Sequence, residues 1–168
     1  DKINPQLIEK FSTLFDKIII STIYSKSQET IPFFANAQNA NRFLKGEAKN
    51  IWAAENGLLF FIDYLEGQKT GFFIDQRENR ELLGKYSKGK TVCNTFCYSG
   101  GFSLYALQHG AKKVVSVDSS ERAMELVEKN LANNFKDTTN HESVKADVFK
   151  YFASLYFFVF TVELLNFL

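Results

Sequence analysis

The second half of the chain alternates short apolar runs with helical patterns. Apolar runs at 91–96, 114–117 and 144–146 predict three strands, each followed by a polar or glycine-containing turn. Between them, apolar residues at helical spacing predict one helix after Gly101 and a longer one over 120–133. Strands that alternate with helices are joined by right-handed crossovers, so the pattern predicts an α/β fold with a parallel sheet.

The first half of the chain is less regular. Apolar residues at helical spacing follow Asn4 and Pro5 and predict a helix that reaches Ile18. A β-branched run to Tyr24 predicts a strand, and the polar residues 25–50 predict a loop-rich connector. These elements indicate a small α+β region ahead of the α/β part.

A hairpin is predicted where this region ends. The apolar runs 58–64 and 69–74, separated by a turn that contains Gly67, predict two antiparallel strands. Mixed charges over 75–86 then predict a helix that leads into the α/β part.

We therefore predict two domains in the 168 residues. The first is an α+β domain over residues 1–76, with its hairpin at 58–74. The second is the α/β domain over residues 77–168.

Composition narrows the function classes only slightly. The chain is 45% hydrophobic and 23% charged, which is ordinary for a globular protein and argues against disorder. A formal net charge of +1 neither favours nor excludes nucleic acid, so such a contact would depend on local patches or on protein outside this chain. The two cysteines do not form a disulfide framework and indicate a reducing, cytoplasmic setting. The apolar stretch 151–168 contains Glu163, which argues against a membrane span.

Three features fall at the carboxyl ends of the predicted strands, where an open α/β sheet binds its ligand. The first strand runs into the loop 96–101, whose glycines let a ligand approach the backbone closely. The second strand ends at Asp118, whose carboxylate can accept the ribose hydroxyls of an adenosine. The third ends at Asp147, placed to accept from an adenine amine while Val148 packs on the ring. Taken singly, the glycines can be turn residues and the aspartates helix caps; together, they favour an adenosine-type cofactor.

The loop favours S-adenosylmethionine over a dinucleotide. A dinucleotide site uses Gly-x-Gly-x-x-Gly and a helix N-terminus to hold a pyrophosphate. This loop lacks that pattern and contains the bulky Tyr98. Because S-adenosylmethionine has no phosphate, a looser loop is sufficient.

Two segments then resemble a known family. The block KTGFFIDQR at 69–77 and the loop FCYSGGF at 96–102 are similar to those of methyltransferases that make 5-methylcytosine in large-subunit ribosomal RNA. The resemblance covers about residues 55–151. It implies a class I methyltransferase fold, with a Rossmann-like parallel sheet that is incomplete in this chain, and ribosomal RNA as the substrate.

The resemblance also implies a set of cofactor contacts. Tyr98, Ser99 and Gly100 would line the methionine and ribose side, Asp118 would hold the ribose and Asp147 the adenine amine. Gln76 or Arg77 would close over the cofactor, although Arg77 could instead form a structural ion pair. Asn94 stands where many S-adenosylmethionine enzymes outside this family have an acid. The complete predicted set is Gln76, Arg77, Phe96, Tyr98, Ser99, Gly100, Asp118, Ser119, Asp147 and Val148.

The chemistry of that family needs residues that this sequence does not show. Methylation at carbon 5 requires a thiolate that adds to carbon 6 and a base that later removes a proton. The family has an Asp-Pro-Pro-x-Phe segment and a later cysteine, but here the only prolines are Pro5 and Pro32 and no cysteine follows Cys97. Cys93 is expected to be a buried strand thiol, and Cys97 to meet the methionine end of the cofactor. The catalytic residues stay unassigned, and we expect a truncated or frame-shifted chain that folds imperfectly and does not methylate RNA.

Two other functions stay open at this stage. The chain could be a non-catalytic cofactor-binding or interaction module that uses the same sheet, or a nucleotide-dependent oxidoreductase, which the loop pattern disfavours. No metal site is expected, because His109 and His141 have no ligand-like neighbours in the sequence and are predicted to lie at the surface. We expect no membrane contact, and a homodimer is possible.

Overall fold

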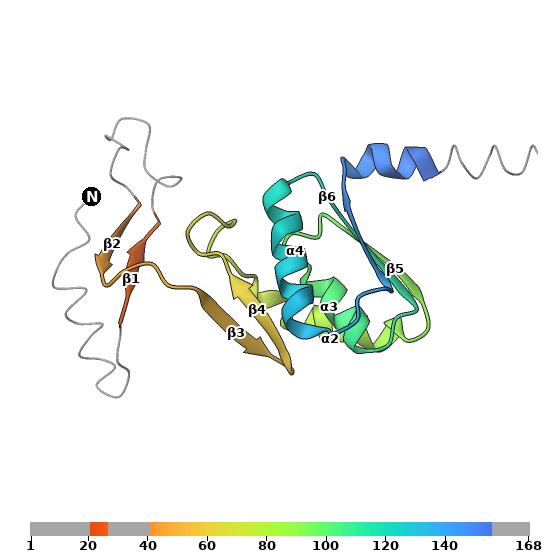
Figure 1. The fold of residues 1–168 in the computed structure, drawn as a ribbon, viewed down its shortest axis with the longest axis horizontal. Coiled ribbons are helices and arrows are strands. Elements are labelled where there is room, and N and C mark those ends of the chain that lie inside the picture. Colours follow the sequence, from red (N-terminus) through yellow and green to blue (C-terminus); the bar gives the residue numbers. More distant parts are fainter. Residues whose placement is uncertain (1–20, 27–40, 156–168) are drawn as a thin grey trace, which may run out of the picture. The chain divides into compact units, whose positions relative to one another are not determined.

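The computed structural model describes residues 21–26 and 41–155, which form two units that divide after Asn50 (Figure 1). In the first unit, β1 (Ile23–Ser25) pairs antiparallel with β2 (Arg42–Lys45), and the rings of Tyr24 and Phe43 lie 4.8 Å apart. β2 falls within the segment predicted as a connector. The helix predicted between Pro5 and Ile18 lies outside the described residues.

The second unit contains the predicted parallel sheet. Its strands are β5 (Thr91–Thr95), β6 (Lys113–Asp118) and β7 (His141–Lys145), in the order β5-β6-β7. Both strand pairs are parallel. The α/β prediction is therefore confirmed, and β5 forms an edge of the sheet among the described residues.

Helices cover both faces of this sheet. α3 (Gly101–Gln108) and α4 (Glu121–Asn134) pack on the face that carries Val114 and Ser116. Residues 148–155 are helical and begin on the opposite face, where Val148 packs with Val115 and Val117. The capping residue of α4 is Ser120, because its hydroxyl accepts a hydrogen bond from the Ala123 N–H.

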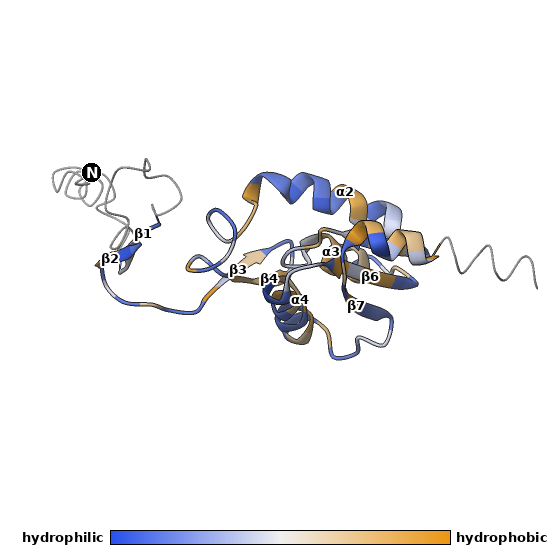
Figure 2. Cartoon of the chain, turned by 90° about the horizontal axis from the view of Figure 1, so that it is seen from above, coloured by the Kyte–Doolittle hydropathy of each residue, from blue (hydrophilic) through white to orange (hydrophobic). Residues whose placement is uncertain are grey.

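A further helix forms an outer layer. α2 (Arg77–Ser87) follows a short 3₁₀ helix, η2 (Ile74–Gln76), and packs on α3. In Figure 2 most of α2 is hydrophilic, as expected for an outer helix. The packing is close at Gly84, where an added Cβ would lie 2.5 Å from the His109 ring.

The hairpin differs from the prediction. β4 (Leu58–Ile62) is a strand as expected, but it pairs antiparallel with the preceding β3 (Ile51–Glu55). Asn56 and Gly57 connect them, both with positive φ (48° and 85°), which is the backbone that a two-residue hairpin turn requires. The prediction that 69–74 forms the returning strand was wrong. The Asn56-Gly57 turn lies before β4, so β4 pairs with β3 instead.

The hairpin also belongs to the second unit, whereas the predicted boundary was after residue 76. The reason is that two asparagines of α4 form hydrogen bonds with the backbone of β4, in the way that a neighbouring strand would. Asn134 both accepts from the Leu59 N–H and donates to the Leu59 carbonyl, and Asn130, one helical turn earlier, accepts from the Phe61 N–H. The edge of β4 is thus tied to the α/β part.

A buried ion pair strengthens this attachment. Arg80 of α2, only 3% exposed, donates two hydrogen bonds of 2.8 Å to the two carboxylate oxygens of Glu55 at the end of β3. The Tyr105 hydroxyl of α3 donates to the same carboxylate at 2.9 Å. The guanidinium also donates to the Phe73 carbonyl and lies 4.6 Å from the Phe72 ring centroid. Four segments of the unit therefore meet at one charge pair.

A chain of polar side chains crosses the sheet beneath α3. Asn94 donates to Ser103, whose hydroxyl lies 2.6 Å from that of Ser116, and His141 closes the chain at 2.8 Å from Ser116. His141 was predicted to lie at the surface, but its side chain is partly buried. Burial lowers the pKa of its ring, which favours the neutral form. Asn94 is thus turned toward α3.

We predict that Glu55→Ala destabilises the second unit by about 3–5 kcal/mol, because it leaves the Arg80 charge buried without a counter-charge. Urea unfolding of the chain measures this free energy. Arg77→Ala is the matched control: Arg77 pairs with Glu78 at the surface, with 56% and 80% of their side chains exposed, and should cost no more than about 1 kcal/mol. Equal effects of the two variants would contradict the prediction.

Candidate functional site

The loop after β5 follows a tight left-handed path. Phe96, Tyr98 and Gly100 have φ values of 53°, 49° and 75°. Outside glycine this conformation is uncommon and costs roughly 1–3 kcal/mol per residue, and such strain is concentrated at functional sites. The backbone of this loop is therefore strained, and contacts with the surrounding structure must stabilise it.

Asp118 at the end of β6 holds this loop. One carboxylate oxygen accepts from the Tyr98 N–H and the other from the Ser120 N–H, both at 3.0 Å. The carboxylate therefore joins the ends of two adjacent strands, β5 and β6. Each oxygen keeps a further lone pair that can accept a hydrogen bond from a ligand.

The loop forms one wall of a cleft of about 440 Å³, a size within the range of about 300–1,000 Å³ that is usual for small-molecule sites. The opposite wall comes from the segment between β4 and α2. The lining residues are Gln68, Phe72, Phe73, Gln76, Arg80, Phe96, Cys97, Tyr98, Ser99, Gly101, Phe102, Asp118, Ser119 and Ser120.

Six of the ten predicted cofactor residues lie together in this cleft: Gln76, Phe96, Tyr98, Ser99, Asp118 and Ser119. Gly100 belongs to the same loop but faces α4. A Cβ added at Gly100 would lie 3.2 Å from a Val127 methyl group. Phe96 is 65% exposed and presents its ring at the cleft.

The structure places the other three residues elsewhere. Arg77 pairs with Glu78 at the surface, the alternative that the sequence left open. Asp147 caps the following helical residues by accepting from the Lys150 N–H at 2.9 Å, and Val148 is buried against the sheet. Residue 149 nevertheless adjoins the cleft, because the rings of Phe149 and Phe96 are 6.2 Å apart in an edge-to-face contact.

Sequence reasoning missed most of the second wall. Phe73 meets the Tyr98 ring edge-to-face at 5.7 Å, and the Tyr98 hydroxyl donates to the Gly71 carbonyl. Gly67 and Gly71 are the sequence features that could have indicated this wall. An added Cβ at these positions would lie 2.2 Å and 2.6 Å, respectively, from backbone atoms of Asp63. The path of this wall thus depends on close backbone approach.

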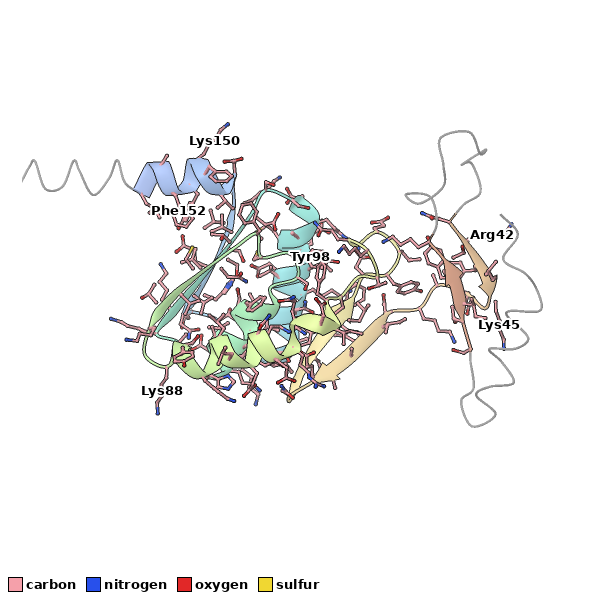
Figure 3. The ribbon with its side chains drawn as sticks, turned by 180° about the vertical axis from the view of Figure 1, so that it is seen from behind. Arg42, Lys45, Lys88, Tyr98, Lys150 and Phe152 are labelled. Carbon is pink, nitrogen blue, oxygen red and sulfur yellow. The ribbon has the colours of Figure 1, made fainter. Side chains whose placement is uncertain are left out.

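An ion pair fixes the start of the same wall. The buried carboxylate of Asp63 accepts from Arg122 of α4 at 2.9 Å and from the Glu66 N–H. Burial alone would raise the pKa of Asp63, but these hydrogen bonds outweigh it and the pKa is lowered. Burial, followed by the charge of Asp63, raises the pKa of the Tyr98 hydroxyl, which therefore stays protonated as a donor. Tyr98 is half-buried and lies near the middle of the second unit in Figure 3.

The cysteines do not have the environment of a nucleophile. Burial and the neighbouring Asp118 charge raise the pKa of Cys97 to about 12, so almost no thiolate forms at neutral pH. Cys93 is exposed, contrary to expectation, and lies on β5, an edge strand of the sheet in the described part of the chain. Partial desolvation raises its pKa as well.

No group of three or more His, Cys, Asp or Glu side chains in the described part of the chain is arranged to bind a metal ion. Among the helices of residues 21–26 and 41–155, none is both long and apolar enough to cross a membrane.

Comparison with known proteins identifies the family. A profile of S-adenosylmethionine-dependent methyltransferases matches residues 14–159. The chain belongs to this family. The match confirms the predicted methyltransferase family at this level, together with S-adenosylmethionine as its cofactor.

The methyltransferase chain is similar to longer proteins. Ribosomal RNA large subunit methyltransferase I of Aeromonas hydrophila is 40% identical over 132 residues, which cover 77% of this chain and 33% of that protein. A ribosomal RNA large subunit methyltransferase of Deinococcus radiodurans is 48% identical over 97 residues, covering 58% and 24%. The chain spans about a third of the length, or less, of these curated relatives.

Solved structures confirm the fold class. A candidate methyltransferase from Streptococcus mutans matches with a TM-score of 0.75 and 29% identity, over 91% of this chain and 39% of its own. A candidate methyltransferase in complex with SAH matches with a TM-score of 0.76 and 31% identity, over 91% and 38%. The chain thus has the α/β fold of class I methyltransferases.

We predict that Gly71→Ala destabilises the methyltransferase chain by at least 1 kcal/mol more than Gly110→Ala does. Both glycines have positive φ (90° and 82°), so both variants incur the left-handed penalty of about 1–2 kcal/mol. Only at Gly71 does the new Cβ meet the backbone of Asp63, whereas at Gly110 it meets nothing within 4 Å. Urea unfolding compares them, and equal losses would show that the cleft wall is not closely packed at Gly71.

Proposed function

We propose that this chain forms the S-adenosylmethionine-binding part of a methyltransferase that acts on a base of large-subunit ribosomal RNA, making 5-methylcytosine. The cleft at the carboxyl ends of β5 and β6 is the observation that carries this proposal, because a strained loop and a carboxylate meet there. The names of the relatives support ribosomal RNA as the substrate. The sequence resemblance supports cytosine.

Within the cleft, the residues have complementary tasks. Asp118 would accept the ribose hydroxyls through the lone pairs that the loop N–H groups leave available. The exposed ring of Phe96, which is in edge-to-face contact with Phe149, offers a flat apolar surface for the adenine. Ser99 and Gly100 would lie along the methionine side. The bound cofactor supplies the methyl group.

The methyl-transfer step needs a thiolate nucleophile, and neither cysteine of this chain suits that task. Both thiols have raised pKa values, and Cys97 is packed in the apolar core beside the cofactor cleft. The proposal therefore gives this chain cofactor binding without turnover, and the nucleophile and general base are not assigned to its residues. A purely non-catalytic module would share the same cleft, and methyl transfer by a longer form of the protein would separate the two functions.

We predict that S-adenosylhomocysteine binds this chain in a calorimetric titration and that Asp118→Ala weakens binding at least tenfold, since each lost hydrogen bond to a charged group contributes about 1.5–3 kcal/mol. NAD should not compete. Asp137→Ala is the matched control, because Asp137 is an exposed aspartate that also accepts from a backbone N–H, that of Thr139.

Because Asp118 also holds the loop, Asp118→Asn serves as a second variant that keeps one oxygen acceptor. It should bind more tightly than Asp118→Ala and more weakly than the unaltered chain. No binding by the folded chain, or equal binding by Asp118→Ala and Asp137→Ala, would contradict the proposed site.

A further inference from the structure

Five lysines gather at the edge of the sheet where the strands begin. They come from the end of α2, the turn before β5, and the turn before β6 with the first residue of β6. We call them the lysine edge: Lys85, Lys88, Lys90, Lys112 and Lys113. Backbone hydrogen bonds hold the two turns side by side, from the Lys112 N–H to the Lys90 carbonyl and from the Gly89 N–H to the Gly110 carbonyl, both 2.8 Å. The cluster is therefore built by the fold.

This edge is basic although its unit is not. Residues 51–168 contain 13 Lys or Arg and 14 Asp or Glu. At the lysine edge, Glu81 pairs with Lys85 and Glu142 with Lys113. No ion pair joins the other three lysines to an acidic residue within the described ranges, and all three side chains are exposed: Lys88, Lys90 and Lys112.

The surface around these three lysines is open. Gly89 and Gly110, at the tips of the two turns, would each carry an added Cβ with no atom within 4 Å. Tyr86, two residues before Lys88, is 76% exposed and offers an aromatic face beside the charges. Open turns, free ammonium groups and an exposed ring are the features with which proteins bind phosphates and stack on bases.

We propose that the lysine edge binds the sugar–phosphate backbone of RNA, at the opposite end of the strands from the cofactor cleft. In Figure 3 the Lys88 side chain points outward from the end of the unit that is remote from Tyr98. Strands of five residues separate the two ends by about 17 Å, a distance that a folded RNA spans easily. The inference rests on the proposed function, and it identifies where the substrate is anchored away from the reacting base.

The test measures binding of an in vitro transcribed large-subunit ribosomal RNA fragment to the 168-residue chain between 50 and 200 mM salt. Each phosphate contact contributes about 0.7 to the slope of log K against log salt for single strands. Lys88→Gln/Lys112→Gln should therefore reduce that slope by about 1.4 and weaken binding roughly 25-fold at 0.1 M salt. The matched control, Lys145→Gln/Lys150→Gln, removes the same charge at the other end of the sheet and should change affinity less than threefold.

Three results would overturn the inference: equal weakening by the two double variants, no RNA binding by the unaltered chain, or binding of polyglutamate as tight as that of RNA. The last would indicate an acidic protein partner. A parallel titration with S-adenosylhomocysteine distinguishes failure of the lysine-edge inference from failure of the proposed cofactor site. Its binding should be unchanged in every lysine variant, and its loss in the unaltered chain would count against the cofactor site.

Discussion

The buried pair of Arg80 and Glu55 determines how the second unit is assembled. Its two charges belong to α2 and β3, and Tyr105 of α3 adds a third partner to the carboxylate. A buried ion pair contributes little net stability, but each partner imposes a strict requirement on the other, since either charge alone would be costly. The hairpin and the two helices must therefore take one relative position, and only in that position are all the polar groups satisfied.

The cofactor cleft follows from this arrangement. Arg80 also holds the Phe73 carbonyl and lies against Phe72, so the same guanidinium that fixes the hairpin fixes the wall opposite the loop. On the other side, the Asn130 side chain accepts from the Phe61 N–H and donates to the Ser99 carbonyl. This one side chain of α4 therefore links the hairpin to the loop. Both walls are thus anchored to β3 and β4. The close approach of Arg80 to Gly101, 3.0 Å from an added Cβ, explains why the first residue of α3 has no side chain.

Periodicity was enough to predict the elements of the sheet, because alternating strands and helices leave a local pattern in the sequence. Asp118 could be predicted as well, since its place at a strand end fixes where the carboxylate lies. The contacts that build the second wall are tertiary and leave no such pattern: Arg80 meets a partner 25 residues earlier, and nothing local distinguishes it from Arg77, which lies at the surface. The hairpin could have been found from Asn56 and Gly57.

We propose that one cleft is built from two parts of the chain, the segment 68–76 and the loop 96–102, and that both contact the cofactor. Hydrogen–deuterium exchange with and without S-adenosylhomocysteine tests it directly, because a ligand that contacts a segment suppresses its local opening. We predict slower exchange in both segments on binding. Protection of the loop alone, with residues 68–76 unchanged, would contradict it.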